Sequence, residues 1–252
     1  MYDITPALVE DMEFFDSLRD ALGDSNPTVV ANAVSSISEI SAKSGKEVVK
    51  LTTAVLQKIL AALNECTEWG QVFILDILCN YIPANMQEVE GIIDRVTPRL
   101  QHANSAVVLS AIKVVLHFME EVTDEDKLRS YHKKLGPPLV SLLNADHVIQ
   151  YTALRFINLV VLKYPKLLEH EIKVFFCKYN DPVYVKIEKL QLMTLLVSER
   201  NVDQVLLELK EYATEGYLLT HPLTHSLFTH SLKWMWNLFV NQSARLAIVP
   251  LN

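Results

Sequence analysis

Four segments of this chain share one pattern, in which a short polar residue is followed at once by an apolar helix start. They read Asn26-Pro27-Thr28-Val29-Val30, Asn104-Ser105-Ala106-Val107-Val108, Asp146-His147-Val148-Ile149-Gln150 and Asp181-Pro182-Val183-Tyr184-Val185. A weaker fifth copy, Glu68-Trp69-Gly70-Gln71-Val72, lies between the first two, so the copies are 42, 36, 42 and 35 residues apart. Repeats of about 35–47 residues with two helices each are typical of HEAT or armadillo solenoids. The spacing therefore predicts an all-α solenoid of about ten antiparallel helices.

The residues at these starts explain why helices should begin there. Asn26 and Asp181 have short side chains whose oxygen can accept from the free amides of a first helical turn. Pro27 and Pro182 are expected at the first helical position, where a missing N–H removes no hydrogen bond. The partner helices are expected upstream of each start, over residues 7–22, 47–63, 86–101, 125–143 and 165–178.

One of these partner helices contains two prolines. Pro137 and Pro138 lie in an apolar part of the helix expected over 125–143. Proline lacks the N–H that bonds the carbonyl four residues earlier, and its ring crowds that carbonyl. We therefore expect the helix to kink or restart at this point instead of continuing.

The composition is that of a large apolar core. Half of the residues are hydrophobic, 21% are charged and only six of 252 are glycine. Scarce glycine disfavours tight-turned sheets and glycine-rich phosphate loops. The formal net charge of −7 disfavours a nucleic-acid partner, because nucleic-acid binders normally carry a basic excess.

The three cysteines and the start of the chain indicate the cellular compartment of the protein. Cys66, Cys79 and Cys177 are too few and too scattered for a disulfide framework or a zinc knuckle, so we expect reduced thiols. The first residues lack the basic and apolar regions of a signal peptide, and no apolar run reaches about 18 residues. We expect a cytoplasmic protein.

Five longer segments of the sequence resemble one family. They are Asp24–Val34, Ala62–Gln71, Arg95–Ala111, Glu171–Leu190 and Glu208–Glu215. In this order they resemble β-adaptin, the large β subunit of clathrin adaptor complexes. The resemblance covers residues 1–215 and corresponds to the middle part of the helical trunk in that family.

The resemblance implies a structural subunit of a clathrin-associated coat in vesicle-mediated intracellular protein transport, including endocytosis and transport at the Golgi. It implies binding to the second large, medium and small adaptor subunits, and to clathrin through the complex. It also implies peripheral association with coated membranes at the Golgi, endosomes or plasma-membrane pits, with no cofactor and no catalysed reaction. The alternative is a generic helical-repeat scaffold or transport receptor. An importin is disfavoured because the chain lacks its inner Trp/Asn array, and no motif supports an enzyme.

Residues 216–252 depart from the repeats and from the resemblance, and are expected to form a divergent tail instead of a native helix pair. His221, His225 and His230 lie there, spaced as metal ligands could be on a helix, but without an intervening carboxylate and with Pro222 between the first two. An unselected sequence is the favoured interpretation. The amphipathic segment 232–240 could touch a membrane interface, although aggregation is the simpler account.

A ladder of lysines is the last candidate surface. It consists of Lys163, Lys166, Lys173, Lys178, Lys186 and Lys189. Such residues can converge on one ridge of a solenoid and meet acidic lipid headgroups, but interleaved carboxylates favour a mixed, solvated face. We predict no catalytic, cofactor-binding or metal-binding residue. Asn26, Trp69, Asn104 and Asp181 are expected to be structural anchors only.

Overall fold

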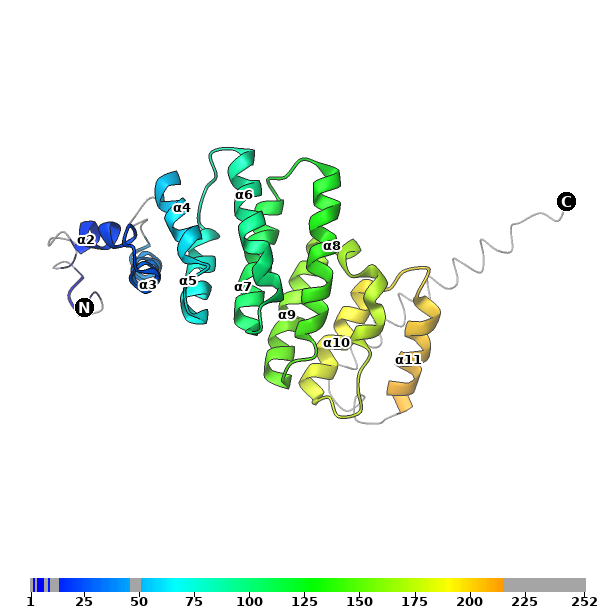
Figure 1. Ribbon diagram of the computed structural model, residues 1–252. Helices are drawn as coiled ribbons and strands as arrows, with labels where there is room; N and C mark the ends of the chain where they lie inside the picture. The colour runs from blue at the N-terminus through cyan, green and yellow to red at the C-terminus, as the bar shows by residue number, and fades with distance from the viewer. Residues whose placement is uncertain (1, 3, 7–8, 10–13, 46–50, 215–252) are drawn as a thin grey trace. The chain divides into compact units, whose positions relative to one another are not determined.

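The computed structural model describes residues 2, 4–6, 9, 14–45 and 51–214, which form ten α-helices and three 3-10 helices without a strand among them (Figure 1). The chain divides into two compact units, Met1–Pro138 and Leu139–Asn252. The all-α prediction is confirmed for the described residues.

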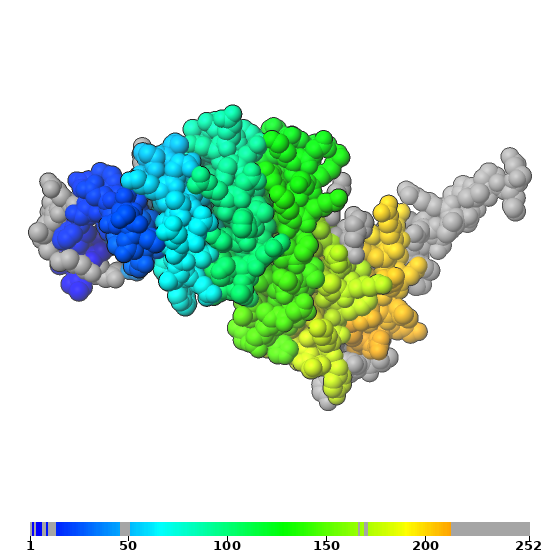
Figure 2. Space-filling model, in the orientation of Figure 1, coloured from blue at the N-terminus to red at the C-terminus, as the bar shows by residue number. Residues whose placement is uncertain are grey.

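Unit 1 contains helix pairs that follow one another along the chain, seen as successive colour bands in Figure 2. Its elements are α2 (Phe14–Ala21), α3 (Pro27–Ser44), α4 (Thr53–Ala62), α5 (Glu68–Leu78), α6 (Met86–Val96), η1 (Thr97–Gln101), α7 (Ser105–Met119) and most of α8 (Glu125–Leu142). Helix α5 packs against α3 on one side and α7 on the other. This is the nearest-neighbour packing of a solenoid.

Unit 2 contains α9 (His147–Lys163), η2 (Pro165–Leu167), η3 (Glu169–Phe175), α10 (Val183–Leu196) and α11 (Val202–Thr214). Helices α9 and α10 pack against each other, and η3 packs on α10. The α-helix expected over 165–178 is replaced by two short 3-10 helices. Leu168, between the two, has φ/ψ values of −121°/11°, and Glu171, inside η3, has values of −103°/22°. Neither pair of angles is helical.

The predicted helix starts at Asn26 and Asn104 are confirmed. The side-chain oxygen of Asn26 accepts from the N–H of Thr28 at 2.9 Å, and that of Asn104 accepts from Ala106 at 2.9 Å. Pro27 is the first residue of α3, where its missing N–H removes no bond. Both helices therefore start where the sequence predicted, with the predicted chemistry.

The start at Asp181 differs from the prediction. Helix α10 begins at Val183, and Pro182 occupies the N-cap position without a side-chain capping bond. Asp181 is buried, and its carboxylate accepts from the Lys178 backbone N–H at 2.7 Å and from Lys189 Nζ at 2.6 Å. Because both bonds go to Oδ2, Asp181 anchors the turn before α10 and the helix body instead of capping its first turn.

Equivalent positions of successive repeats in unit 1 are joined by side-chain hydrogen bonds. Asn104 Nδ2 donates to Glu68 Oε2 at 2.6 Å across 36 residues, and Lys127 Nζ donates to Glu90 Oε1 at 2.6 Å across 37 residues. Further bonds of this spacing join Arg99 to Asn64, Lys58 to the Gly23 carbonyl and Lys113 to Asp76. The sequence separations match the interval between repeats, so these bonds repeat along unit 1 as the solenoid does.

Gly70 allows α5 to approach α3 closely. A Cβ at this position would lie 3.0 Å from the Cβ atoms of Ala31 and Cys66, which is closer than ordinary contact. Gly70 is buried, and Ala31 on the facing helix is 5% exposed. The small pair sets the distance between these two helices.

Helix α8 continues through Pro137 and Pro138, so the predicted interruption is wrong. The two prolines remove the bonds to the carbonyls of Lys133 and Lys134. Both lysines are exposed, so water can reach this side of the helix. The cost of the two missing bonds is therefore smaller than it would be in a buried helix.

Candidate interaction surfaces

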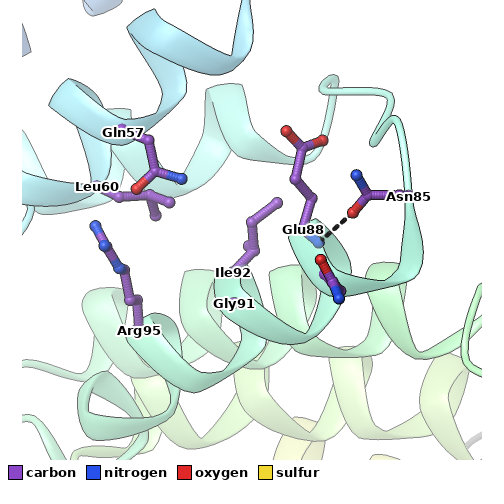
Figure 3. Close-up of a pocket in the computed structure, with 8 residues that line it drawn as sticks. Gln57, Leu60, Asn85, Glu88, Gly91, Ile92 and Arg95 are labelled. Carbon is purple, nitrogen blue, oxygen red and sulfur yellow. Dashed lines mark hydrogen bonds between the residues drawn. The ribbon is translucent and has the colours of Figure 1, made fainter.

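A groove of about 230 Å³ lies between α4 and α6 in unit 1 (Figure 3). Leu60 and Ile92 contribute its apolar part and are each 1% exposed. Its polar lining comes from Gln57, Asn85, Gln87, Glu88 and Arg95, and Gly91 leaves space that a side chain would fill. The groove therefore has an apolar base with polar sides.

The Glu88 carboxylate already accepts hydrogen bonds from within the protein. Its Oε2 accepts from the backbone N–H of Ala84 at 2.9 Å and from the Tyr81 hydroxyl at 3.0 Å. The Ala84 amide, followed by the Thr53 hydroxyl and Tyr81, holds the pKa of the Glu88 carboxyl below its usual value. Asn85 caps α6 by accepting from the Glu88 backbone N–H at 2.9 Å. These groups fix the turn before α6 and are not arranged to transfer a proton to a ligand.

Arg95 is the cationic group of the groove, and it makes no ion pair with a described residue. It lies near Gln57 across the groove in Figure 3. A guanidinium presents five donors and no acceptor, so it can bind a carboxylate or carbonyl but cannot serve as a base at neutral pH. The groove therefore offers hydrogen bonds and one positive charge to a bound group.

Helix α5 exposes an aromatic stripe on unit 1. Trp69 is 76% exposed and Phe73, one helical turn later, is 36% exposed. Trp69 was expected as a structural anchor; it is instead a surface residue, and Thr67 caps α5 by accepting from Gly70 N–H at 3.4 Å. Exposed aromatic side chains are enriched in protein interfaces, where they bury a large area with few rotatable bonds. The sequence signal that could have identified this was the polar pair Thr67-Glu68, which directly precedes Trp69.

The lysine ladder does not form one basic ridge. Lys189 is 1% exposed and pairs with buried Asp181, so it cannot reach a membrane. Lys163 is exposed and lies 5.9 Å from the ring centroid of Tyr164. Lys173 and Lys178 are also exposed, and Lys186 is half-buried. The backbone of Lys166 is in η2, and its side chain lies outside the described part.

The cysteines are free thiols, as expected. Burial raises the pKa of Cys66 and Cys79, and raises that of Cys177 to about 12. In the part of the chain that the structure describes, no three histidine, cysteine or acidic side chains are grouped as metal ligands. His221, His225 and His230, like the rest of 215–252, lie outside the described residues.

Comparison with known proteins gives the relatives of this chain. The family described as Adaptin N terminal region matches residues 1–217. The chain is 58% identical over 215 residues to an AP-1 complex subunit beta of Dictyostelium discoideum and 57% identical over 217 residues to the human AP-1 complex subunit beta-1. It is 35% identical over 216 residues to the AP-2 complex subunit beta of Schizosaccharomyces pombe.

Each match covers 85% of this chain, but only 23% of the two AP-1 subunits and 32% of the AP-2 subunit. The chain thus spans about a quarter to a third of the length of these relatives. Among the described helices, none is both long and apolar enough to cross a bilayer.

Proposed function

Because this chain belongs to the adaptin family, we propose that it is a trunk segment of the β subunit of a clathrin-associated adaptor complex. The observation that carries the proposal is the identity of 57–58% with AP-1 β subunits over 85% of the chain. The predicted resemblance to β-adaptin and the HEAT-type solenoid are confirmed by the same finding and by the all-helical fold. The placement in the middle of the trunk and the boundary at residue 215 stay predictions.

The proposed mode of action is binding without catalysis. Stacked helix pairs joined by side-chain bonds, such as Asn104 to Glu68 and Lys127 to Glu90, form a stiff support. The aromatic stripe of Trp69 and Phe73 offers contact area on that support. A rigid, pre-organised surface loses little conformational entropy on binding, which favours a stable assembly.

The partners in this proposal are the second large, medium and small subunits of the same complex. Clathrin and a coated membrane would be reached through the assembled complex, which makes the chain a peripheral, cytoplasmic component of vesicle-mediated transport. The net charge of −7 supports protein partners over nucleic acid.

The test is affinity purification of the tagged full-length gene product from its own cells. The proposal expects the other three adaptor subunits in stoichiometric amounts. Recovery of a different stable partner without any adaptor subunit would replace the proposal by a generic scaffold or transport receptor. A second purification in high salt separates a true complex, whose interfaces contain buried apolar area, from charge-driven contaminants.

A further inference from the structure

Unit 2 exposes several large apolar side chains on the neighbouring helices α9 and α10. In α9, Val148 is 66% exposed, Leu159 68% and Leu162 65%. These three residues, with Thr152 and Arg155, recur at intervals of three or four residues and lie on one side of the helix. Exposed apolar side chains that gather on one surface mark an interaction site more often than singly scattered ones do.

Helix α10 extends this surface. Two contacts join the helices at the same sequence offset: the rings of Tyr151 and Tyr184 meet edge to face with centroids 5.4 Å apart, and Arg155 Nη1 lies 3.3 Å from Glu188 Oε1. Because both offsets are 33 residues, the helices are parallel and in register (Figure 1). The same offset pairs Leu162 with Leu195, which is 39% exposed.

We call this surface the α9–α10 face and define it by its exposed apolar and cationic residues. They are Val148, Arg155, Leu159, Leu162, Lys163, Val183, Tyr184 and Leu195.

The charges on the α9–α10 face have one sign. Arg155 and Lys163 are exposed, whereas the one carboxylate of the two helices, Glu188, is 5% exposed. Nη1 of Arg155 donates to Glu188 Oε1, and the other N–H groups of Arg155 donate to no described residue. The chain as a whole carries a formal charge of −7, so an apolar surface with only cationic exposed charges is a local exception. A complementary surface would be apolar and acidic.

We propose that the α9–α10 face binds an amphipathic segment of another adaptor subunit, one whose apolar stripe is bordered by carboxylates; this inference rests on the proposed function. The apolar side chains of the segment pack on Leu159, Leu162 and Leu195. A carboxylate of the segment accepts from the open edge of the Arg155 guanidinium. Covering the face removes water from the Arg155–Glu188 pair, which strengthens its electrostatic attraction.

Two other occupants fit the face less well. In a symmetric contact between two copies the face would meet itself. Arg155 and Lys163 would then lie near the same positive charges of the second copy. An anionic membrane would gain only about 1 kcal/mol from each of the two cations. No exposed tryptophan lies among the residues of the face to anchor it at the headgroups.

The experiment compares two opposite charges at one exposed position. Leu159→Glu and Leu159→Lys remove the same leucine, and at 68% exposure both should fold. In affinity purification of the tagged full-length gene product, we expect Leu159→Glu to lower recovery of the partner subunits by about tenfold, because a carboxylate meets carboxylates. Leu159→Lys should lower it distinctly less. Leu207→Glu on α11, at 71% exposure, is the matched control and should leave recovery unchanged.

A photo-crosslinking amino acid at Leu162 identifies the occupant. A crosslink to an acidic, amphipathic peptide of another adaptor subunit supports the proposal. Crosslinks between two copies of this chain would overturn it. So would the absence of crosslinks together with binding of the wild-type protein, through this face, to vesicles of phosphatidylcholine and phosphatidylserine. Normal recovery of all subunits with Leu159→Glu refutes this inference alone, whereas failure of the wild type to recover any subunit refutes the proposed function as well.

Discussion

Lys189 Nζ lies 2.6 Å from Asp181 Oδ2 in the interior of unit 2, with side chains that are 1% and 3% exposed. The lysine comes from the middle of α10 and the aspartate from the turn before it, eight residues earlier. Asp181 Oδ2 also accepts from the Lys178 backbone N–H, and Lys189 lies 3.5 Å from the Phe176 carbonyl. The pair joins the turn to the helix and satisfies the part-buried Lys178 N–H and Phe176 carbonyl, which an apolar contact could not do.

Removing one member of this pair should destabilise the protein strongly. Asp181→Ala leaves the Lys189 ammonium buried without its counter-charge, which typically costs about 3–5 kcal/mol. Urea unfolding followed by circular dichroism measures the change. Arg129→Ala is the control, because Arg129 pairs with Asp126 and Glu125 at the surface, where the expected loss is below about 1 kcal/mol. Equal losses in the two variants would show that the buried pair is not important for stability.

The two asparagine caps should differ in strength. Asn26→Ala removes a capping bond, which costs about 1 kcal/mol. Asn104→Ala removes an equivalent cap and also the bond from Asn104 Nδ2 to Glu68 Oε2, so its loss should be larger by about 0.5–1.5 kcal/mol. Glu68→Ala removes the bond to Asn104 and leaves the Asn104 cap in place. If Glu68→Ala equalises the effects of the two cap substitutions, the difference arises from this bond; a persistent difference would assign it to the caps themselves.

The sequence predicted the parts of the fold that depend on neighbouring residues. Asn26-Pro27 and Asn104-Ser105 carry their capping chemistry within three residues, so the helix starts could be identified without tertiary information. Asp181-Pro182 looks the same in sequence, but its aspartate faces a lysine that only the folded chain brings close. For the same reason Lys189 was counted as a surface charge.

The surfaces were harder to predict than the helices. The groove between α4 and α6 joins Gln57 to Arg95, which are 38 residues apart and share no local pattern. In the sequence, the α9–α10 face could not be distinguished from the core, because α9 carries large apolar residues on both its exposed and its buried side. Which side of such a helix is covered depends on its neighbours in space, so exposure of Leu159 and Leu162 required the structure.

Acid should weaken the α6 start through Glu88. The pKa of this carboxyl is lower in the folded protein than its ordinary value of 4.5, mainly because the Ala84 N–H bonds the charged form. A group with a depressed folded pKa contributes stability above its unfolded pKa and loses that contribution as the pH falls through the folded pKa. Glu88→Gln should therefore be less stable than wild type at pH 7, and the gap should shrink at pH values well below 4.5. Urea midpoints at pH 7 and pH 3 test this, with Glu199→Gln as control; a gap that does not depend on pH would contradict it.

Cys177 should resist alkylation in the native state. Burial raises the pKa of its thiol from 9.0 to about 12, which lowers the thiolate fraction at pH 8 about a thousandfold. Since the thiolate is the nucleophile, iodoacetamide should modify Cys177 far more slowly in native protein than in urea-unfolded protein. Peptide mass spectrometry over a time course gives the two rates. Equal rates would show that the thiol is accessible and ionises normally.

The aromatic stripe of α5 should matter for assembly and little for folding. Trp69 is 76% exposed and donates no hydrogen bond to a described residue, so Trp69→Ala should change stability by no more than about 0.5 kcal/mol. Phe118 in α7 is fully buried, and Phe118→Ala should cost about 3–5 kcal/mol through the cavity that it leaves. Thermal unfolding compares the two variants with wild type.

Co-purification then separates the surface role of Trp69 from a structural one. If the stripe contacts another subunit, Trp69→Ala should lower the recovery of that subunit several-fold, because truncating an interface tryptophan commonly costs about 2 kcal/mol or more. The unfolding temperature of the variant should stay at the wild-type value. Trp69→Phe, which keeps an apolar ring, should restore part of the recovery. Unchanged recovery with Trp69→Ala would mean that this side of α5 remains in water in the assembled complex, and a lowered unfolding temperature would mean that Trp69 supports the fold despite its exposure.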